Sequence, residues 1–356
     1  MRALMRVLVL FVGCSGVALG QSERVFTRTM TELSTDQAEV LTTTRSGGLL
    51  FDSLQTLSPE AAEILGKYRG LNLSLNGLDS LTPEVAKGLG HYVYNLSLDG
   101  LKTLSPEAVE ALGPGARSLS LDGLTTMPLA LAEVLARHEG VAISLGGLTT
   151  ISSEVAQVLA KYPGFLKLTG VKSMSPEAAS MLATHEGRLS LSGIESLTPE
   201  LAAALATYRG DLMLDGLRTI SPEAAQALAS HEGPECILGL RTMSTEVAEA
   251  LIDYKGDLWL PALERLPDDV AEILSKHTGR LILGIDALTT QAAWALSKYE
   301  GPGLALSDLT TISYDAAAAF SDFNGELRLT GLKSADRETI RLLRRNRDIV
   351  LPDDFR

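Results

Sequence analysis

Residues 189–205 read LSLSGIESLTPELAAAL, and residues 212–228 read LMLDGLRTISPEAAQAL. The two stretches begin 23 residues apart and share their leading leucines, a glycine, a Ser/Thr-Pro-Glu step and an alanine-rich end. Related units run from about Leu49 to Lys333, and a degenerate unit opens at Leu33. Such a fixed short period is the signature of a repeat protein, in which each unit buries its apolar face only against its neighbours.

Each unit has a strand half and a helix half. In the Leu-x-Leu segment both leucines point to one face of a strand and the middle residue to the other. The step Ser58-Pro59-Glu60 and its equivalents predict a helix start with a hydroxyl N-cap, a proline at the first helical position and a favourably placed acid. A glycine recurs every 23 residues from Gly164 to Gly279, and we expect the helices to end at these glycines.

Stacking the units gives a continuous parallel sheet on one side and a layer of short helices on the other. Adjacent strands lie about 4.8 Å apart, whereas packed helices need about 8–10 Å. The sheet is therefore expected on a concave face, and alanines such as Ala62 and Ala179 let the helices approach closely. The predicted fold class is an α/β solenoid.

These units resemble bacterial leucine-rich repeats, particularly the cysteine-containing subtype in which the strand is followed by Cys-x-x-Ile-Thr-Asp. Here Leu217-x-x-Ile220-Ser stands in the corresponding place. The unit is shortened to 23 residues and lacks the Asn or Cys ladder of the family. The resemblance implies a right-handed solenoid that binds a protein partner on its concave sheet, and it names no partner.

The ends of the chain suggest four regions. Residues 1–20 read as a signal peptide, with Arg2 and Arg6 before an apolar run and a small-x-small cleavage pattern that ends at Gly20. The alternative is a lipoprotein lipidated at Cys14, which the short apolar run and Phe11 make less favoured. Residues 21–48 are expected to form an N-terminal cap with the degenerate first repeat, 49–333 about twelve repeats, and 334–356 a capping helix and strand.

The C-terminal region carries a basic cluster of Arg341, Arg344, Arg345 and Arg347. Solenoids need a polar cover over the last coil, and we favour that role over the alternative, a contact with an acidic partner. The whole chain has a net charge of −13, which disfavours nucleic acid and anionic membrane surfaces as partners. After residue 20 no stretch approaches the ~20 apolar residues of a membrane span.

No motif in the sequence indicates catalysis. We find no metal-ligand spacing, nucleophile elbow, phosphate loop or dinucleotide fingerprint, so neither an enzyme nor a cofactor is expected. Histidines and tyrosines alternate at one repeat position, and we interpret each histidine as a favourable positive charge at a helix C-terminus. Equivalent histidines two coils apart would lie roughly 10 Å from each other, too far to share a metal ion. The alternating residues are His138, Tyr162, His185, Tyr208, His231, Tyr254, His277 and Tyr299.

The middle residue of Leu-x-Leu is informative because it points away from the core. It is serine in most N-terminal units and becomes apolar later. Strict spacing would turn Glu235 inward, which a charged group resists, so we place Cys236 and Leu238 inward and Ile237 outward. The outward residues are Ser74, Ser97, Ser120, Ser144, Lys167, Ser190, Met213, Ile237, Trp259, Ile282 and Ala305.

We hypothesise that Met213, Ile237, Trp259 and Ile282 form a binding surface, flanked by three acids, because apolar patches with polar rims mark interfaces and tryptophan is a favoured anchor. The flanking acids are Asp211, Glu235 and Asp257. The alternative is that a terminal segment covers these coils or that the sheet tolerates apolar residues.

Trp294, on the outer helix face, either packs on a neighbour or marks a second contact. The expected function is that of a secreted or envelope-associated monomer that mediates protein–protein interaction. The alternative is a structural, self-associating protein of the cell envelope.

Overall fold

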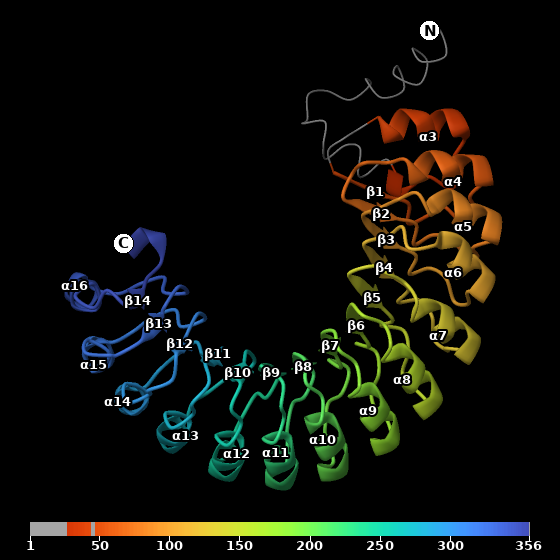
Figure 1. Ribbon diagram of the computed structural model, residues 1–356. Helices are drawn as coiled ribbons and strands as arrows, with labels where there is room; N and C mark the ends of the chain where they lie inside the picture. The colour runs from red at the N-terminus through yellow and green to blue at the C-terminus, as the bar shows by residue number, and fades with distance from the viewer. Residues whose placement is uncertain (1–26, 44–46, 356) are drawn as a thin grey trace. The chain divides into compact units, whose positions relative to one another are not determined.

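The computed structural model describes residues 27–43 and 47–355, which divide into two compact units after Gly123. In both units short strands alternate with short helices along the chain. Within each unit, the strands line one side and the helices the opposite side (Figure 1). The predicted signal peptide and the alternative lipidation site at Cys14 lie outside the described residues.

The strands of each unit pair in parallel and in sequence order, so every coil adds one strand beside the preceding one. In the first unit the strands are β1 (Gly48–Leu50), β2 (Asn72–Ser74), β3 (Asn95–Ser97) and β4 (Ser118–Ser120). In the second they are β5 (Ala142–Ser144), β6 (Phe165–Lys167), β7 (Leu189–Ser190), β8 (Leu212–Leu214), β9 (Glu235–Leu238), β10 (Asp257–Leu260), β11 (Leu281–Leu283), β12 (Gly303–Ala305), β13 (Glu326–Arg328) and β14 (Ile349–Val350).

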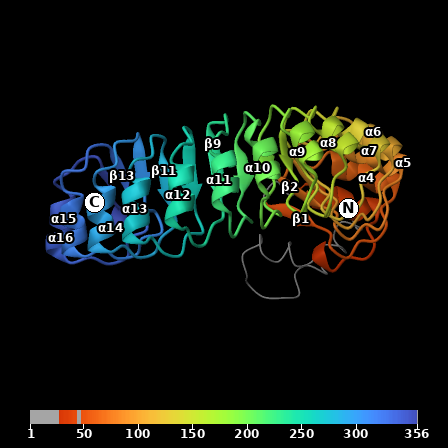
Figure 2. The same ribbon diagram turned by 90° about the horizontal axis from the view of Figure 1, so that it is seen from below.

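The helices follow the same rule, and within the second unit they stand side by side in chain order (Figure 2). In the first unit they are α3 (Thr35–Thr42), α4 (Pro59–Gly66), α5 (Pro83–Leu89) and α6 (Pro106–Leu112). In the second they are α7 (Leu129–Leu135), α8 (Ser153–Leu159), α9 (Pro176–Leu182), α10 (Pro199–Ala206), α11 (Pro222–Leu228), α12 (Thr245–Leu251), α13 (Asp268–Leu274), α14 (Thr290–Leu296), α15 (Tyr314–Ala319) and α16 (Arg337–Leu343), with a 3₁₀ turn at Asp353–Phe355. This alternation confirms the predicted α/β leucine-rich-repeat solenoid.

The helix starts form as their sequence predicts. Ser58 accepts a hydrogen bond from the Ala61 N–H at 3.1 Å, and Pro59 occupies the first position of α4. An N-cap hydroxyl of this kind stabilises a helix by about 1 kcal/mol. Among the described helices, α7 and α13 have no side-chain cap, because Pro128 and Pro267 occupy their N-cap positions.

The prediction that helices end at the recurring glycine is wrong. Helix α8 ends at Leu159, and Gly164 comes four residues after the cap Ala160, directly before β6. Its left-handed freedom is not used either, because positive φ among the described residues occurs at Gly47, Gly113 and Gly325. The recurring position requires glycine for close approach: a Cβ at Gly187 would collide with the Gly164 carbonyl oxygen.

The alternating histidines and tyrosines form a buried column in the second unit, and the interpretation of charged histidines is wrong for His231 and His277. Both are at least nine-tenths buried, and burial lowers the pKa of each imidazole, so both rings are neutral at pH 7. The rings stack at centroid distances of 6.0 Å between Tyr208 and His231 and 5.7 Å between His231 and Tyr254. The Tyr254 hydroxyl donates a hydrogen bond to the Gly233 carbonyl oxygen at 2.8 Å. At His231 and His277 the column therefore packs the coils together and supplies no positive charge.

Candidate functional site

The predicted outward row lies in register on the strand face of the second unit. Met213 is the Cα partner of Ile237, Ile237 of Trp259, and Trp259 of Ile282. The predicted inward turn of Cys236 is confirmed: it pairs with Leu212 and Leu258 and is 3% exposed. With strands about 4.8 Å apart, the four outward residues span roughly 14 Å.

The row is apolar but only partly open to solvent. Met213, Trp259 and Ile282 are half-buried, whereas Ile237 is 6% and Ala305 7% exposed. Ile237 and Ala305 are thus covered by their neighbours, and Met213, Trp259 and Ile282 carry the accessible apolar surface. The indole Nε1 of Trp259 is buried and has no hydrogen-bond partner in the part of the chain that the structure describes.

The three predicted acids lie along one flank of this row. Glu235 and Asp257 are Cα partners on β9 and β10, and Asp211 directly precedes β8. The Asp211 carboxylate lies 3.1 Å from the Arg188 Nε. Asp257 accepts a hydrogen bond from the backbone N–H of Arg280 at 2.9 Å.

Glu235 lies between the other two acids and differs from them. It forms no ion pair with any described residue, and it is half-buried. Its pKa is raised, first by burial and then by the nearby charge of Asp211, with a further contribution from Asp257 that Arg188 partly offsets. The centre of this flank therefore holds a half-buried carboxylate that forms no ion pair with any other described residue.

The opposite flank of the row carries few side chains. Gly239 follows β9 and Gly284 follows β11, with Pro261 between them after β10. A Cβ at either glycine would collide with a backbone carbonyl oxygen of the preceding coil, that of Asp215 or of Pro261. Beside Ile237, Trp259 and Ile282 the surface is therefore asymmetric, with carboxylates on one side and nearly bare backbone on the other. Beside Met213 the same position, directly after β8, is the exposed Asp215, whose carboxylate accepts a hydrogen bond from Ser192.

The first unit uses its strand face differently, in a way that sequence reasoning missed. Asp99 Oδ1 accepts hydrogen bonds from the Ser120 hydroxyl at 2.6 Å and from the Asp122 N–H at 2.9 Å. The Asp99 N–H in turn donates to Asn76 Oδ1 at 2.9 Å. This side-chain ladder ties neighbouring coils together and engages the outward serines. The signal was available in the 23-residue spacing of Asn76, Asp99 and Asp122.

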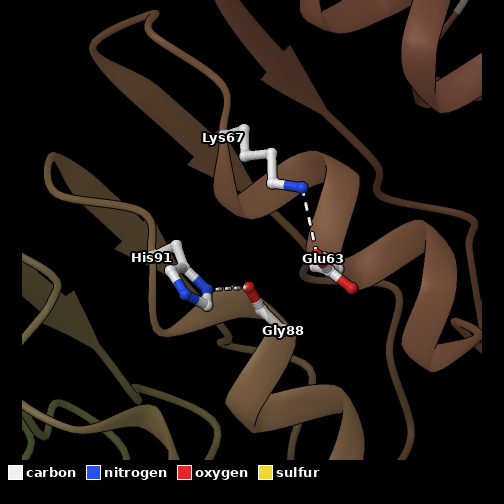
Figure 3. Close-up of polar contacts among 4 residues, drawn as sticks. All are labelled: Glu63, Lys67, Gly88 and His91. Atoms are coloured by element: carbon white, nitrogen blue, oxygen red, sulfur yellow. Dashed lines mark hydrogen bonds and ion pairs between the residues drawn. The ribbon is translucent and has the colours of Figure 1, made fainter.

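Residues of α4 and α5 line a shallow surface on the helix side of the first unit, and two separate polar contacts lie there (Figure 3). Lys67 Nζ lies 3.0 Å from Glu63 Oε1 on α4, and this hydrogen bond and charge lower the pKa of Glu63. His91 approaches the Gly88 carbonyl oxygen separately, at 3.4 Å. Over residues 27–43 and 47–355, no three His, Cys, Asp or Glu side chains come together as a metal site.

Two other predictions concern the role of Trp294 in the second unit and the absence of a membrane-spanning helix. Trp294 is 50% exposed on α14, so it does not pack into the core, and its role as a second contact stays a prediction. Within the described ranges, no helix has the length and apolar character that crossing a membrane requires.

Among solved structures, the chain is similar to a leucine-rich-repeat protein of Leptospira interrogans, at 18% sequence identity and a TM-score of 0.38, with 98% of each chain covered. It is also similar to an internalin from Listeria monocytogenes, at 15% identity and a TM-score of 0.38, covering 90% of this chain and 89% of the internalin. A chain of the Toll–Spätzle complex from Drosophila has 15% identity and a TM-score of 0.37, with 86% of this chain and 42% of that one covered. No family model matches the chain, and no curated protein matches it significantly.

Proposed function

We propose that the chain is a non-catalytic, exported protein-binding module that captures its partner on the strand face of the second unit, with Trp259 as the anchor. The observation that carries this proposal is the in-register row of Met213, Ile237, Trp259 and Ile282 beside a row of carboxylates. Apolar surface with a charged rim favours association, and tryptophan is enriched among residues that dominate binding energy. Export rests on the predicted signal in residues 1–20.

Stability alone does not explain the tryptophan. The outward middle position is serine in most coils of the first unit, so the fold does not require a large apolar side chain there. In addition, a buried N–H without a partner costs about 1–3 kcal/mol, and the Trp259 Nε1 is such a group among the described residues. A residue that is unnecessary for packing and carries this cost is explained by a contact outside the chain.

The test is affinity capture with the chain from residue 21 onward, followed by measurement of affinity for the purified partner. Trp259→Ala is expected to retain the circular dichroism spectrum and thermal midpoint of the parent while weakening binding by about 30-fold or more, the effect of a hot-spot residue of about 2 kcal/mol. Tyr314→Ala is the matched control, because Tyr314 is an exposed aromatic residue on α15, on the helix side of the same unit. Equal affinity of the parent and Trp259→Ala would remove the proposal.

The same preparation separates this function from a structural role in the cell envelope. A monomer of constant mass in light scattering across a wide range of concentration supports capture of a different protein. Growth of the scattering mass with concentration, abolished by Trp259→Ala, would instead identify the row as a self-association surface.

A further inference from the structure

The strand face of the second unit also indicates what kind of partner it fits, an inference that rests on the proposed function and deepens it. We infer that the partner presents an extended segment in which a lysine or arginine lies two positions from a large apolar residue, with the cation at Glu235 and the apolar side chain on the Trp259 row. The occupant is thus a cationic peptide segment of a protein.

The first argument is charge. Along the flank, Arg188 neutralises Asp211 at one end, and Arg280 contacts Asp257 through its backbone N–H. Glu235, between them, has no cation of its own within the described residues. A carboxylate in a half-buried setting binds a guanidinium or ammonium group more strongly than an exposed one does, because less water competes for the pair.

The second argument is spacing. Glu235 and Ile237 are two residues apart on β9, and Asp257 and Trp259 are two apart on β10. In a strand, side chains at positions i and i+2 lie on one face about 7 Å apart. An extended partner segment has the same repeat, so one of its side chains reaches the carboxylates while the next on that face reaches the apolar row.

The third argument is the bare flank. Gly239 and Gly284 carry no side chains beyond the row, and Pro261 adds no charge. Over Ile237 and Trp259 a bound segment therefore meets acidic groups on one side only, which gives it a preferred direction along the strands, whereas Asp215 flanks the row on the other side at Met213. Nucleic acid and anionic lipid are disfavoured, because their phosphates would face the three carboxylates.

The experiment is selection of a random dodecapeptide library, displayed on phage, against the immobilised chain from residue 21 onward. The enriched peptides are then synthesised with a fluorescent label, and their affinities are measured for the parent, Glu235→Gln and Trp259→Ala. We expect enriched sequences to contain Lys or Arg two positions from a large apolar residue. Their affinity should fall about tenfold or more with Glu235→Gln, and also with Trp259→Ala.

Glu326→Gln is the matched control, since Glu326 stands at the equivalent position of β13 and already has Arg328 Nε at 2.6 Å. This variant is expected to bind like the parent. Peptides that depend on Trp259 but bind Glu235→Gln as tightly as the parent would overturn the cationic partner and leave the proposed function standing. A library without any binder sensitive to Trp259→Ala would count against both.

Discussion

Mild acid is expected to destabilise the second unit through its buried histidines. His231 is 5% exposed, and neither ring nitrogen has a hydrogen-bond partner among the described residues. His277 is 2% exposed, with Nε2 3.1 Å from the Gly256 carbonyl oxygen and Nδ1 unpaired within the same ranges. Tyrosine rings stack on His231 from both neighbouring coils. Protonation would therefore place a cation where no water can reach it.

The direction of the effect follows from the pKa values. Burial is the largest influence on both imidazoles and lowers their pKa, while nearby backbone carbonyls and the carboxylate of Asp211 for His231, or of Asp257 for His277, act in the opposite sense. Lys255 adds a lowering influence on His277. The folded state thus binds fewer protons than the unfolded state, so stability is complete above the unfolded pKa of about 6.5 and is lost as the pH falls below it.

The size of the loss is bounded by proton linkage. Each histidine contributes at most about 1.4 kcal/mol of free energy of unfolding per pH unit below the unfolded pKa, because one pKa unit corresponds to about 1.4 kcal/mol. For His231 and His277 together, lowering the pH from 7.5 to 5.5 is expected to remove up to about 2.7 kcal/mol. Most carboxylates stay ionised over this range, so their titration adds little.

The assay is urea denaturation at pH 7.5, 6.5 and 5.5, followed by circular dichroism and tyrosine fluorescence. The double variant His231→Tyr with His277→Tyr uses a residue that the column already accommodates at Tyr208 and Tyr254, and it should lose the acid sensitivity. If tyrosine does not fit, phenylalanine, found at Phe323, replaces it. His91→Gln, a change at an exposed histidine, should retain the full pH dependence. An undiminished loss of stability in the double variant would refute the reasoning.

Three further predictions test the packing of the coils. Gly187→Ala should lower the free energy of unfolding by about 1–3 kcal/mol or more, because its Cβ would collide with a backbone oxygen. In Gly303→Ala the nearest contact of the new Cβ is the flexible Arg280 side chain at 3.4 Å, so urea denaturation should show a clearly smaller loss. Ser221→Ala should lower the free energy of unfolding by about 1 kcal/mol, because α11 loses its N-cap hydrogen bond. An unchanged denaturation midpoint would contradict this prediction. Cys236, whose pKa burial raises to about 12, should react with a maleimide only after denaturation, so rapid labelling of the native chain would be inconsistent with its inward position.

The strands and helices could be predicted because each local signal recurs in most coils and agrees with its neighbours. A serine or threonine followed by proline and glutamate can begin a helix at one place, and the two leucines of a strand must face the core. The register around Ile237 was predictable for the same reason, since the alternative would bury the charge of Glu235. Local propensity and burial selected a single arrangement there.

The role of the histidines could not be predicted from spacing. The position of His231 lies within a few residues of both a helix end and a strand start, and sequence does not show whether such a side chain turns outward or inward. The end of the helix was placed at Gly233, whereas α11 ends at Leu228 and leaves His231 in the connecting turn. There the side chain enters the interior between Tyr208 and Tyr254. Because the helix end was placed a few residues too late, His231 was interpreted as a cation at the surface, whereas it is a neutral ring in the core.

The candidate binding surface could be predicted in part: its position follows from the sequence, and its chemistry does not follow from the fold. Its placement follows from the strand period, and the registers of Met213, Ile237 and Trp259 agree with it. Its chemistry does not follow from the fold, because serine satisfies the same outward position in other coils, where the neighbouring Asp99 carboxylate accepts its hydrogen bond. Packing makes the inward residues alike in every coil and leaves the outward ones free to differ. Where they change to a half-buried tryptophan with an unpaired N–H beside Glu235, which has no ion pair among the described residues, packing of the coils does not account for the change, and a partner that supplies an apolar side chain and a cation would complement both groups.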